Sequence, residues 1–166
     1  YEKFGFLAAK DYWFDNNFRR RFFKNLINLI PISRKPNPES LDLDDTMTLS
    51  KAFMDLGNNI IIFPEGSRGE VGKIQRFRKG AVKFSMGLDV PILPAAIMGA
   101  EKAWPKGEKF IKPFPITVKV LPKIDPPKTK ELSKTAYNKA LSKITKDLEI
   151  KISEAVKELK ETKSPD

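Results

Sequence analysis

The run Ile60-Ile61-Ile62-Phe63 constrains the fold more than any other part of this sequence. Consecutive large apolar residues, most of them β-branched, are typical of a β-strand whose two faces are both covered. Such a strand belongs to a sheet with helices on both sides, because an uncovered face would leave apolar side chains in water. The run therefore predicts an α/β domain built on a mainly parallel sheet.

Strand and helix patterns alternate along the chain on both sides of this run. Apolar, aromatic or β-branched segments predict strands at residues 3–9, 29–32, 90–97 and 116–120. Apolar spacings of three and four residues predict helices at residues 11–29, 45–56 and 81–86. The prolines at positions 91 and 94 favour an edge strand or a bulge. This order predicts a mixed sheet that is parallel at its centre and flanked by helices.

Some of these elements carry their own boundary signals. Asp45, Thr46 and Thr48 are candidate N-caps of the second helix, and Gly57 is its candidate terminator. Residues 116–120 alternate apolar and polar side chains, as a half-exposed strand does.

From residue 129 to residue 160 a single amphipathic pattern replaces this alternation. Lys and Glu surround an apolar stripe formed by Leu132, Tyr137, Leu141, Ile144, Leu148, Ile152, Val156 and Leu159. We expect a long amphipathic helix, straight or bent, that packs on the domain; the alternative is a lysine-rich helix lying on an anionic bilayer. The predicted division is a domain over residues 1–125 and a helical extension over residues 126–166 that packs on the same domain.

The composition limits the chemistry that the chain can perform. It has 166 residues, no cysteine, no histidine and a formal net charge of +10. Disulfides and thiolate chemistry are therefore excluded, and any catalysis by this chain must use groups other than histidine. The charge suits an anionic membrane surface, a phosphorylated substrate, an acidic carrier protein or nucleic acid. We rank nucleic acid last, because the aromatic residues beside the arginines at 19–21 fit a buried helical stripe and no nucleic-acid motif is present.

The loop at residues 63–69 carries residue types that bind anions. Glu65 supplies a carboxylate, and Gly66 permits close approach of the backbone. Ser67 adds a hydroxyl and Arg68 a guanidinium, the group best shaped for two-pronged binding of phosphate. Ligands collect at the carboxyl ends of parallel strands, where this loop begins. The loop predicts an anion site; the alternative is a surface turn closed by an Arg–Glu ion pair.

Further motifs accompany this loop. They are LIPISR at 29–34, FPEGSR at 63–68, FRKGA at 77–81 and VPILP at 90–94. Their basic pair Arg78-Lys79 precedes an expected helix, whose free N–H groups also favour anions. These motifs follow the order, and nearly the spacing, of those in the phospholipid/glycerol acyltransferase family, which the sequence resembles. That family includes the 1-acyl-glycerol-3-phosphate acyltransferases. The resemblance covers about residues 4–123 and implies the glycerol-3-phosphate acyltransferase-like α/β fold.

The resemblance implies an O-acyltransferase of phospholipid synthesis, and residues 1–125 would be its acyltransferase domain, incomplete at the N-terminus. The family transfers a fatty acyl group from acyl-CoA or acyl carrier protein to a glycerol-phosphate or lysophosphatidate acceptor. The acyl thioester is a co-substrate, and no metal or tightly held cofactor is expected. The other expected partners are an anionic membrane surface and an acidic carrier protein. We expect a cytoplasmic protein, peripheral at the inner face of a membrane, with residues 18–26 and the C-terminal helix as candidate contacts.

The residues that the resemblance assigns to substrate binding are Arg34, Glu65, Gly66, Ser67, Arg68 and Lys79. The two arginines would hold the phosphate of the acceptor. Glu65 and Gly66 would shape the glycerol site, with the carboxylate hydrogen-bonding a hydroxyl. The serine stands where the family has Ser or Thr, and Lys79 would add positive charge near the phosphate or the thioester.

The family's catalytic element, a His followed five positions later by an Asp, is not in this sequence. The His takes the proton of the attacking hydroxyl, and the Asp orients the imidazole. We expect this pair upstream of Tyr1, and negligible acyltransferase activity for the polypeptide by itself. The alternatives are a non-catalytic module that binds lysophospholipids or an anionic membrane, and a replacement base, for which Glu65 is a poor candidate.

Overall fold

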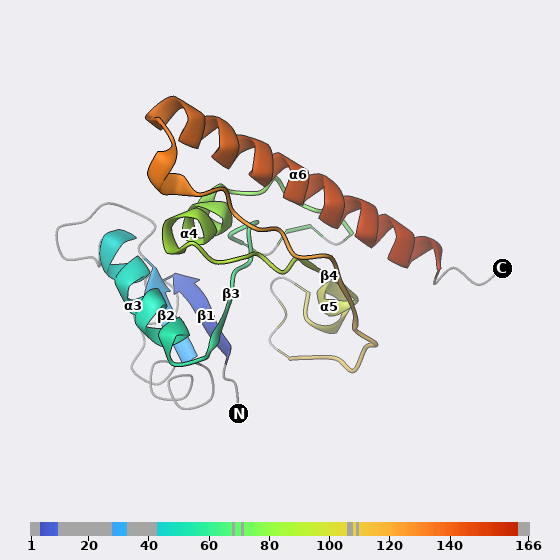
Figure 1. Ribbon diagram of the computed structural model, residues 1–166. Helices are drawn as coiled ribbons and strands as arrows, with labels where there is room; N and C mark the ends of the chain where they lie inside the picture. The colour runs from blue at the N-terminus through green and yellow to red at the C-terminus, as the bar shows by residue number, and fades with distance from the viewer. Residues whose placement is uncertain are drawn as a thin grey trace. The chain divides into compact units, whose positions relative to one another are not determined.

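The computed structural model describes residues 4–9, 28–32, 43–67, 69–70, 72–105, 108 and 110–162. The chain forms two compact units, Tyr1–Phe63 and Pro64–Asp166. Their elements give the predicted α/β architecture, with small sheets and a long C-terminal helix (Figure 1). The helix predicted over 11–29 lies outside the described residues as far as position 27, and its last two residues belong to a strand instead. The arginines at 19–21 and the candidate membrane contact at 18–26 also lie outside the described residues.

The first unit contains a parallel three-stranded sheet. Its strands are β1 (Phe4–Ala9), β2 (Asn28–Ile32) and β3 (Asn59–Ile61), in the order β2-β1-β3. Phe6 at the centre of β1 stands opposite Leu29 of β2 and Ile61 of β3. Helix α3 (Leu43–Asp55) packs against β2 and β3 (Figure 1). The parallel pairing predicted for the centre of the sheet is thus present.

Helix α3 begins earlier than its sequence signals suggest. It starts at Leu43, so the N-caps predicted at positions 45, 46 and 48 are wrong. Thr46 lies inside the helix and is fully buried, so its side chain serves packing. Gly57 ends the helix as predicted: it has a φ of 78°, and its N–H donates to the carbonyl of Met54 at 2.9 Å.

Helix α3 approaches the sheet closely but covers β3 incompletely. A Cβ on Gly5 would lie 2.7 Å from Cε1 of Phe53, so glycine at this position lets the helix reach β1. Ile60 and Ile61 are half-buried and Phe63 is exposed. The predicted strand over 60–63 therefore ends earlier, and its coverage on both faces is not seen. Among the described elements α3 is the one helix that packs on β3, which explains the partial burial.

In its described residues the second unit combines a two-stranded sheet with helices. The elements are α4 (Gly80–Leu88), β4 (Ala95–Met98), α5 (Ala100–Ala103), β5 (Thr117–Val120), a short 3-10 helix (Thr129–Glu131) and α6 (Lys134–Glu161). The strand predicted over 90–97 is confined to β4, because Pro91 and Pro94 cannot donate ladder hydrogen bonds. Before it, Ile92 and Ile124 form an isolated bridge with N–H···O distances of 2.9 and 2.8 Å.

Strand β5 half-buries its polar face and exposes its apolar one. It runs antiparallel to β4, with Lys119 opposite Ala96, which is fully buried. That face lies against α6, which packs on β4, and Lys119 forms an ion pair with Glu158 of α6. Val118 and Val120 point to the other face and are exposed. The alternation predicted a half-exposed strand, and contact with the charged helix α6 decides which half is exposed.

The core of the second unit lies between α4 and α6. Its buried residues are Phe77, Val82, Met86, Leu141 and Leu148. Half-buried side chains of the predicted α6 stripe surround them, among them Tyr137, Ile144 and Ile152. Helix α6 begins at the N-cap Ser133, whose hydroxyl accepts from the N–H of Ala136 at 3.2 Å. Within the described part of the chain, no helix is both long and apolar enough to cross a membrane.

Candidate functional site

The predicted anion loop is folded back on the segment that precedes α4. The carboxylate Oε2 of Glu65 accepts the backbone N–H of Gln75 at 2.8 Å. Three residues further on, the N–H of Arg78 donates to the carbonyl of Pro64 at 2.8 Å. These two bonds bring the FPEGSR and FRKGA motifs together within one unit of the protein. Glu65 therefore closes the loop, and a carboxylate has enough lone pairs to accept a substrate hydroxyl as well.

Gly66 lets the side chain of Arg78 lie against the turn. The φ of Gly66 is 72°, a left-handed conformation that residues with a Cβ rarely adopt. A Cβ there would lie 2.9 Å from Nε and 3.0 Å from Cδ of Arg78. Glycine at this position thus serves both the turn and the close approach of a guanidinium to the backbone.

Helix α6 holds the same segment from the other side. The carboxylate Oε2 of Glu149 accepts the N–H of Phe77 at 2.6 Å, across 72 positions of sequence. The Nζ of Lys79 donates to the hydroxyl of Ser142 at 2.8 Å. The Nζ of Lys160 donates to the carbonyl of Gly72 at 2.9 Å. Three side chains spaced along α6 therefore fix the loop that carries the predicted site.

The basic pair stands where α4 begins. Gly80 is the first residue of the helix, and the preceding Lys79 makes no side-chain cap. The first turn of α4 carries no acidic residue, so positive charge from the helix N-terminus adds to that of Arg78 and Lys79, both exposed. This end of the second unit can hold an anion by backbone N–H groups and by two cationic side chains.

The structure brings together some of the predicted site residues. Glu65 and Gly66 are half-buried in the turn, Ser67 is exposed beside them, and Lys79 is exposed at the start of α4. Arg34 and Arg68 lie outside the described residues, so their predicted role stays a prediction.

Arg78 was predicted as half of the basic pair before α4 but was not among the predicted substrate-binding residues. Its contact with Gly66 depends on the direction of a side chain, and the signal that could have found it is the FRKGA motif itself. Among the described residues, no group of His, Asp and Glu side chains is arranged to hold a metal ion.

Comparisons with known proteins place the chain among related sequences. The sequence profile of the family described as Acyltransferase matches residues 2–98. A 1-acyl-sn-glycerol-3-phosphate acyltransferase of Limnanthes douglasii is 42% identical over 67 residues, which cover 40% of this chain and 24% of that protein. The enzyme of the same name from Cocos nucifera is 33% identical over 85 residues, covering 51% and 27%. That of Borreliella burgdorferi is 31% identical over 101 residues, covering 61% and 39%.

A solved structure shares the fold. The 1-acyl-sn-glycerophosphate (LPA) acyltransferase PlsC of Thermotoga maritima superimposes with a TM-score of 0.62 at 21% identity, covering 96% of this chain and 57% of that one. The chain thus has the α/β fold of this structure. The chain belongs to the Acyltransferase family. Its matches span about a quarter of the plant relatives and just over half of the Thermotoga chain.

Proposed function

We propose that this chain is the acceptor-binding part of a 1-acyl-sn-glycerol-3-phosphate acyltransferase. The observation that carries the proposal is the turn at Gly66 with the Arg78 guanidinium against it, next to Lys79 and the N-terminus of α4. Phosphate suits this place, because Arg78 and Lys79, which carry a guanidinium and an ammonium group, directly precede the N-terminus of α4. Arg34 and Arg68 are proposed to add further charge, and Glu65 and Ser67 to contact the glycerol.

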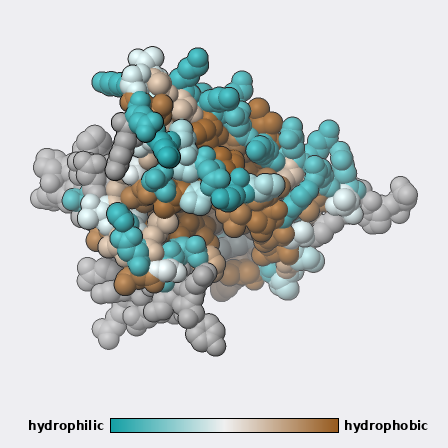
Figure 2. Space-filling view, viewed as in Figure 1, coloured by the Kyte–Doolittle hydropathy of each residue, from teal (hydrophilic) through white to brown (hydrophobic). Residues whose placement is uncertain are grey.

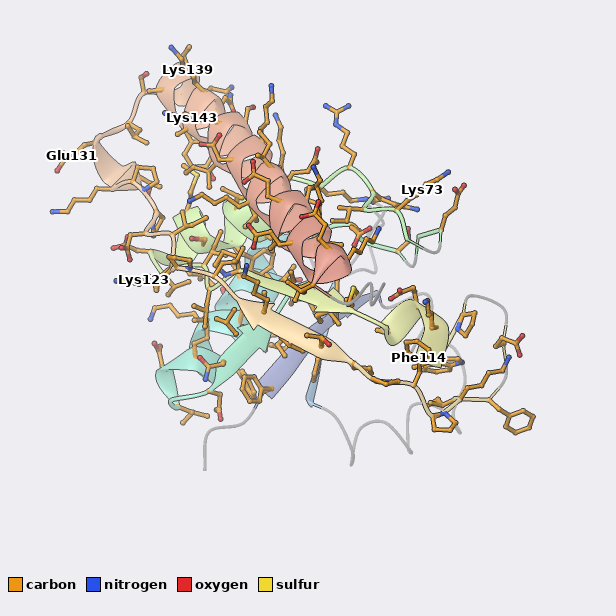
Figure 3. The ribbon with its side chains drawn as sticks, turned by 90° about the vertical axis from the view of Figure 1, so that its right-hand side faces the viewer. Lys73, Phe114, Lys123, Glu131, Lys139 and Lys143 are labelled. Atoms are coloured by element: carbon orange, nitrogen blue, oxygen red, sulfur yellow. The ribbon has the colours of Figure 1, made fainter. Side chains whose placement is uncertain are left out.

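The donor is proposed to be an acyl thioester of coenzyme A or of acyl carrier protein. Both carry phosphate groups, and the first half of α6 is strongly basic. Lys139 and Lys143 are exposed in this half (Figure 3), and Ser142, the partner of Lys79, lies between them in the sequence. The lysines at 134 and 146 extend this charge, and no acidic residue interrupts it before Asp147. A cationic surface next to the acceptor site favours an anionic donor.

Acyl transfer requires a general base, and this polypeptide contains no histidine to serve as one. The acceptor oxygen attacks the thioester carbon, the carbon–sulfur bond breaks, and the hydroxyl proton passes through the base to the leaving thiolate. The chain has no histidine, and Glu65 already holds the N–H of Gln75. We propose that these residues bind and orient the acceptor, while the transfer step needs a base from outside this sequence.

A non-catalytic binding module is the second candidate, favoured by the same absence of histidine. Incubation of the purified chain with acyl-CoA and lysophosphatidate tests the division of labour. We expect acceptor binding without product, because the site residues are present and the base is not. Turnover at a rate typical of enzymes, roughly 1 per second or faster, would contradict this assignment of roles. If the chain does not bind lysophosphatidate, both candidate functions are contradicted, because each requires binding of a lysophospholipid.

A further inference from the structure

Among the described residues, exposed apolar side chains gather in one segment of the second unit. Of the fourteen large hydrophobic side chains that are exposed among the described residues, nine lie between positions 93 and 120. They are Leu93, Ile97, Trp104, Phe110, Ile111, Phe114, Ile116, Val118 and Val120. Figure 2 shows a hydrophobic area in the region of β4 and α5. Large exposed apolar patches mark contact sites for proteins, ligands or membranes.

The patch has two parts that follow each other in the chain. One is the outer face of the β4–β5 sheet, where Ile97 stands opposite Val118. The other lies between α5 and β5, where Phe110 is 80% exposed and Ile111 is 69% exposed. Figure 3 shows Phe114 in this second part, well separated from Lys139 and Lys143 at the start of α6. This second part of the patch is therefore distinct from the basic first half of α6.

The segment between α5 and β5 is held in place before any partner arrives. The N–H of Lys112 donates to the carbonyl of Ala103 at 2.8 Å, which ties the segment to α5. Gly99 has a φ of 95°, and a Cβ there would lie 2.2 Å from the carbonyl oxygen of Pro115. Because these two contacts hold Lys112 and Pro115 in place, the apolar side chains beside them lose little conformational freedom on docking.

The polar groups of this segment suit a medium of low polarity. The indole Nε1–H of Trp104 is already satisfied by the carbonyl of Glu108 at 2.8 Å. Pro105, Pro113 and Pro115 have no backbone N–H, so they leave no donor to desolvate. Trp and Phe side chains collect at the boundary between lipid headgroups and acyl chains.

The charge of the segment suits an anionic lipid surface. Residues 102–120 contain five lysines and one glutamate. Glu108 is paired with Lys112 at 3.8 Å, and Lys102 lies 5.2 Å from the ring centroid of Phe114. Lysines beside inserted aromatic residues keep their charge at the headgroups, where anionic lipids attract them.

We propose that the exposed side chains of Trp104, Phe110, Ile111, Phe114 and Ile116, with the outer face of β4–β5, dock the protein on the surface of an anionic bilayer. The inference rests on the proposed function, because a lysophosphatidate acceptor is a membrane lipid that the domain must reach. It places the membrane contact on this patch, whereas the sequence suggested residues 18–26 and α6.

The test uses vesicles of phosphatidylcholine and phosphatidylglycerol, with brominated acyl chains as a quencher. Trp13 is replaced by Phe so that the emission reports Trp104. We expect a blue shift and quenching on vesicle binding. Phe110→Ser/Ile111→Ser should weaken vesicle partition about tenfold or more, because two largely exposed side chains lose their burial. Leu56→Ser is the matched control: Leu56 is also 80% exposed but lies in the first unit, so partition should stay unchanged.

Several outcomes would overturn the proposal. In the first, the double variant binds vesicles as strongly as the wild type does, and its circular dichroism is unchanged. In the second, the protein binds vesicles but the emission of Trp104 is not quenched. A third is self-association in sedimentation velocity that the double variant abolishes, since a second copy would then occupy the patch. Binding of a short-chain, water-soluble lysophosphatidate separates the two ideas. If the wild type does not bind this lysophosphatidate, the proposed function alone is contradicted. If the double variant still binds it, the two substitutions have removed only membrane docking.

Discussion

The substitution Gly66→Ala tests the turn of the proposed site at the scale of one residue. An alanine there meets two costs, a left-handed φ of 72° and a Cβ 2.9 Å from Nε of Arg78. The first costs about 1 kcal/mol of folding free energy. The second displaces the guanidinium, so we expect the affinity for a water-soluble lysophosphatidate to fall about tenfold or more, which corresponds to about 1.4 kcal/mol.

Gly57→Ala separates these two costs. Gly57 has a φ of 78°, yet a Cβ there would meet nothing within 4 Å. It should lose a similar amount of stability and keep its affinity for the acceptor. Thermal unfolding and isothermal titration of both variants give the comparison. Equal acceptor affinity in the two variants would show that the contact between Gly66 and Arg78 has no part in binding.

Residue identities in the turn could be read from the sequence, whereas their contacts could not. Glu65 and Gly66 were predicted because a carboxylate and a glycine follow a strand. That Glu65 binds the N–H of Gln75, ten positions away, depends on how the loop folds back. That Arg78 lies against Gly66 depends on a side-chain direction, which residue spacing does not determine.

At the scale of elements, helix α6 supports the loop through a carboxylate. Glu149 accepts the N–H of Phe77, whose ring belongs to the core between α4 and α6. Glu149→Ala leaves this backbone N–H without its partner, so we expect a loss of about 1–3 kcal/mol in the free energy of unfolding. Amide hydrogen exchange at Phe77 should become faster as well.

Two variants of the same helix control for this effect. Glu149→Gln keeps an acceptor oxygen and should recover part of the stability and of the amide protection. Glu154→Ala removes an exposed carboxylate and should change neither. Unchanged exchange at Phe77 in Glu149→Ala would contradict a supporting role for α6.

Element types were predictable where local patterns are strong. The strands β1 and β2 and the long helix α6 follow directly from apolar runs and from helical spacing. The start of α3 was not predictable, because the candidate caps at 45–48 lie within the helix, where Thr46 is buried. The face of β5 that turns inward was not predictable from the sequence either. Its polar face is inside because Lys119 pairs with Glu158, a contact between residues 39 positions apart.

At the scale of the whole molecule, the chain combines the fold of its family with a strongly basic composition. The family profile covers residues 2–98, and the Thermotoga structure matches nearly the whole chain in fold. The charge of +10 favours binding of anionic substrates. The central claim is therefore that the second unit recognises the phosphate of a lysophosphatidate-type acceptor.

The most direct test is a pair of titrations with one water-soluble acyl chain, once as lysophosphatidate and once as the monoacylglycerol that lacks the phosphate. We predict that the phosphorylated form binds at least about tenfold more tightly, since charge-assisted hydrogen bonds contribute about 1.5–3 kcal/mol. Arg78→Ala should remove most of this preference, whereas Arg76→Ala, an exposed arginine two positions away, should preserve it. Equal affinity for the two ligands in the wild type, or equal losses in the two variants, would contradict the account.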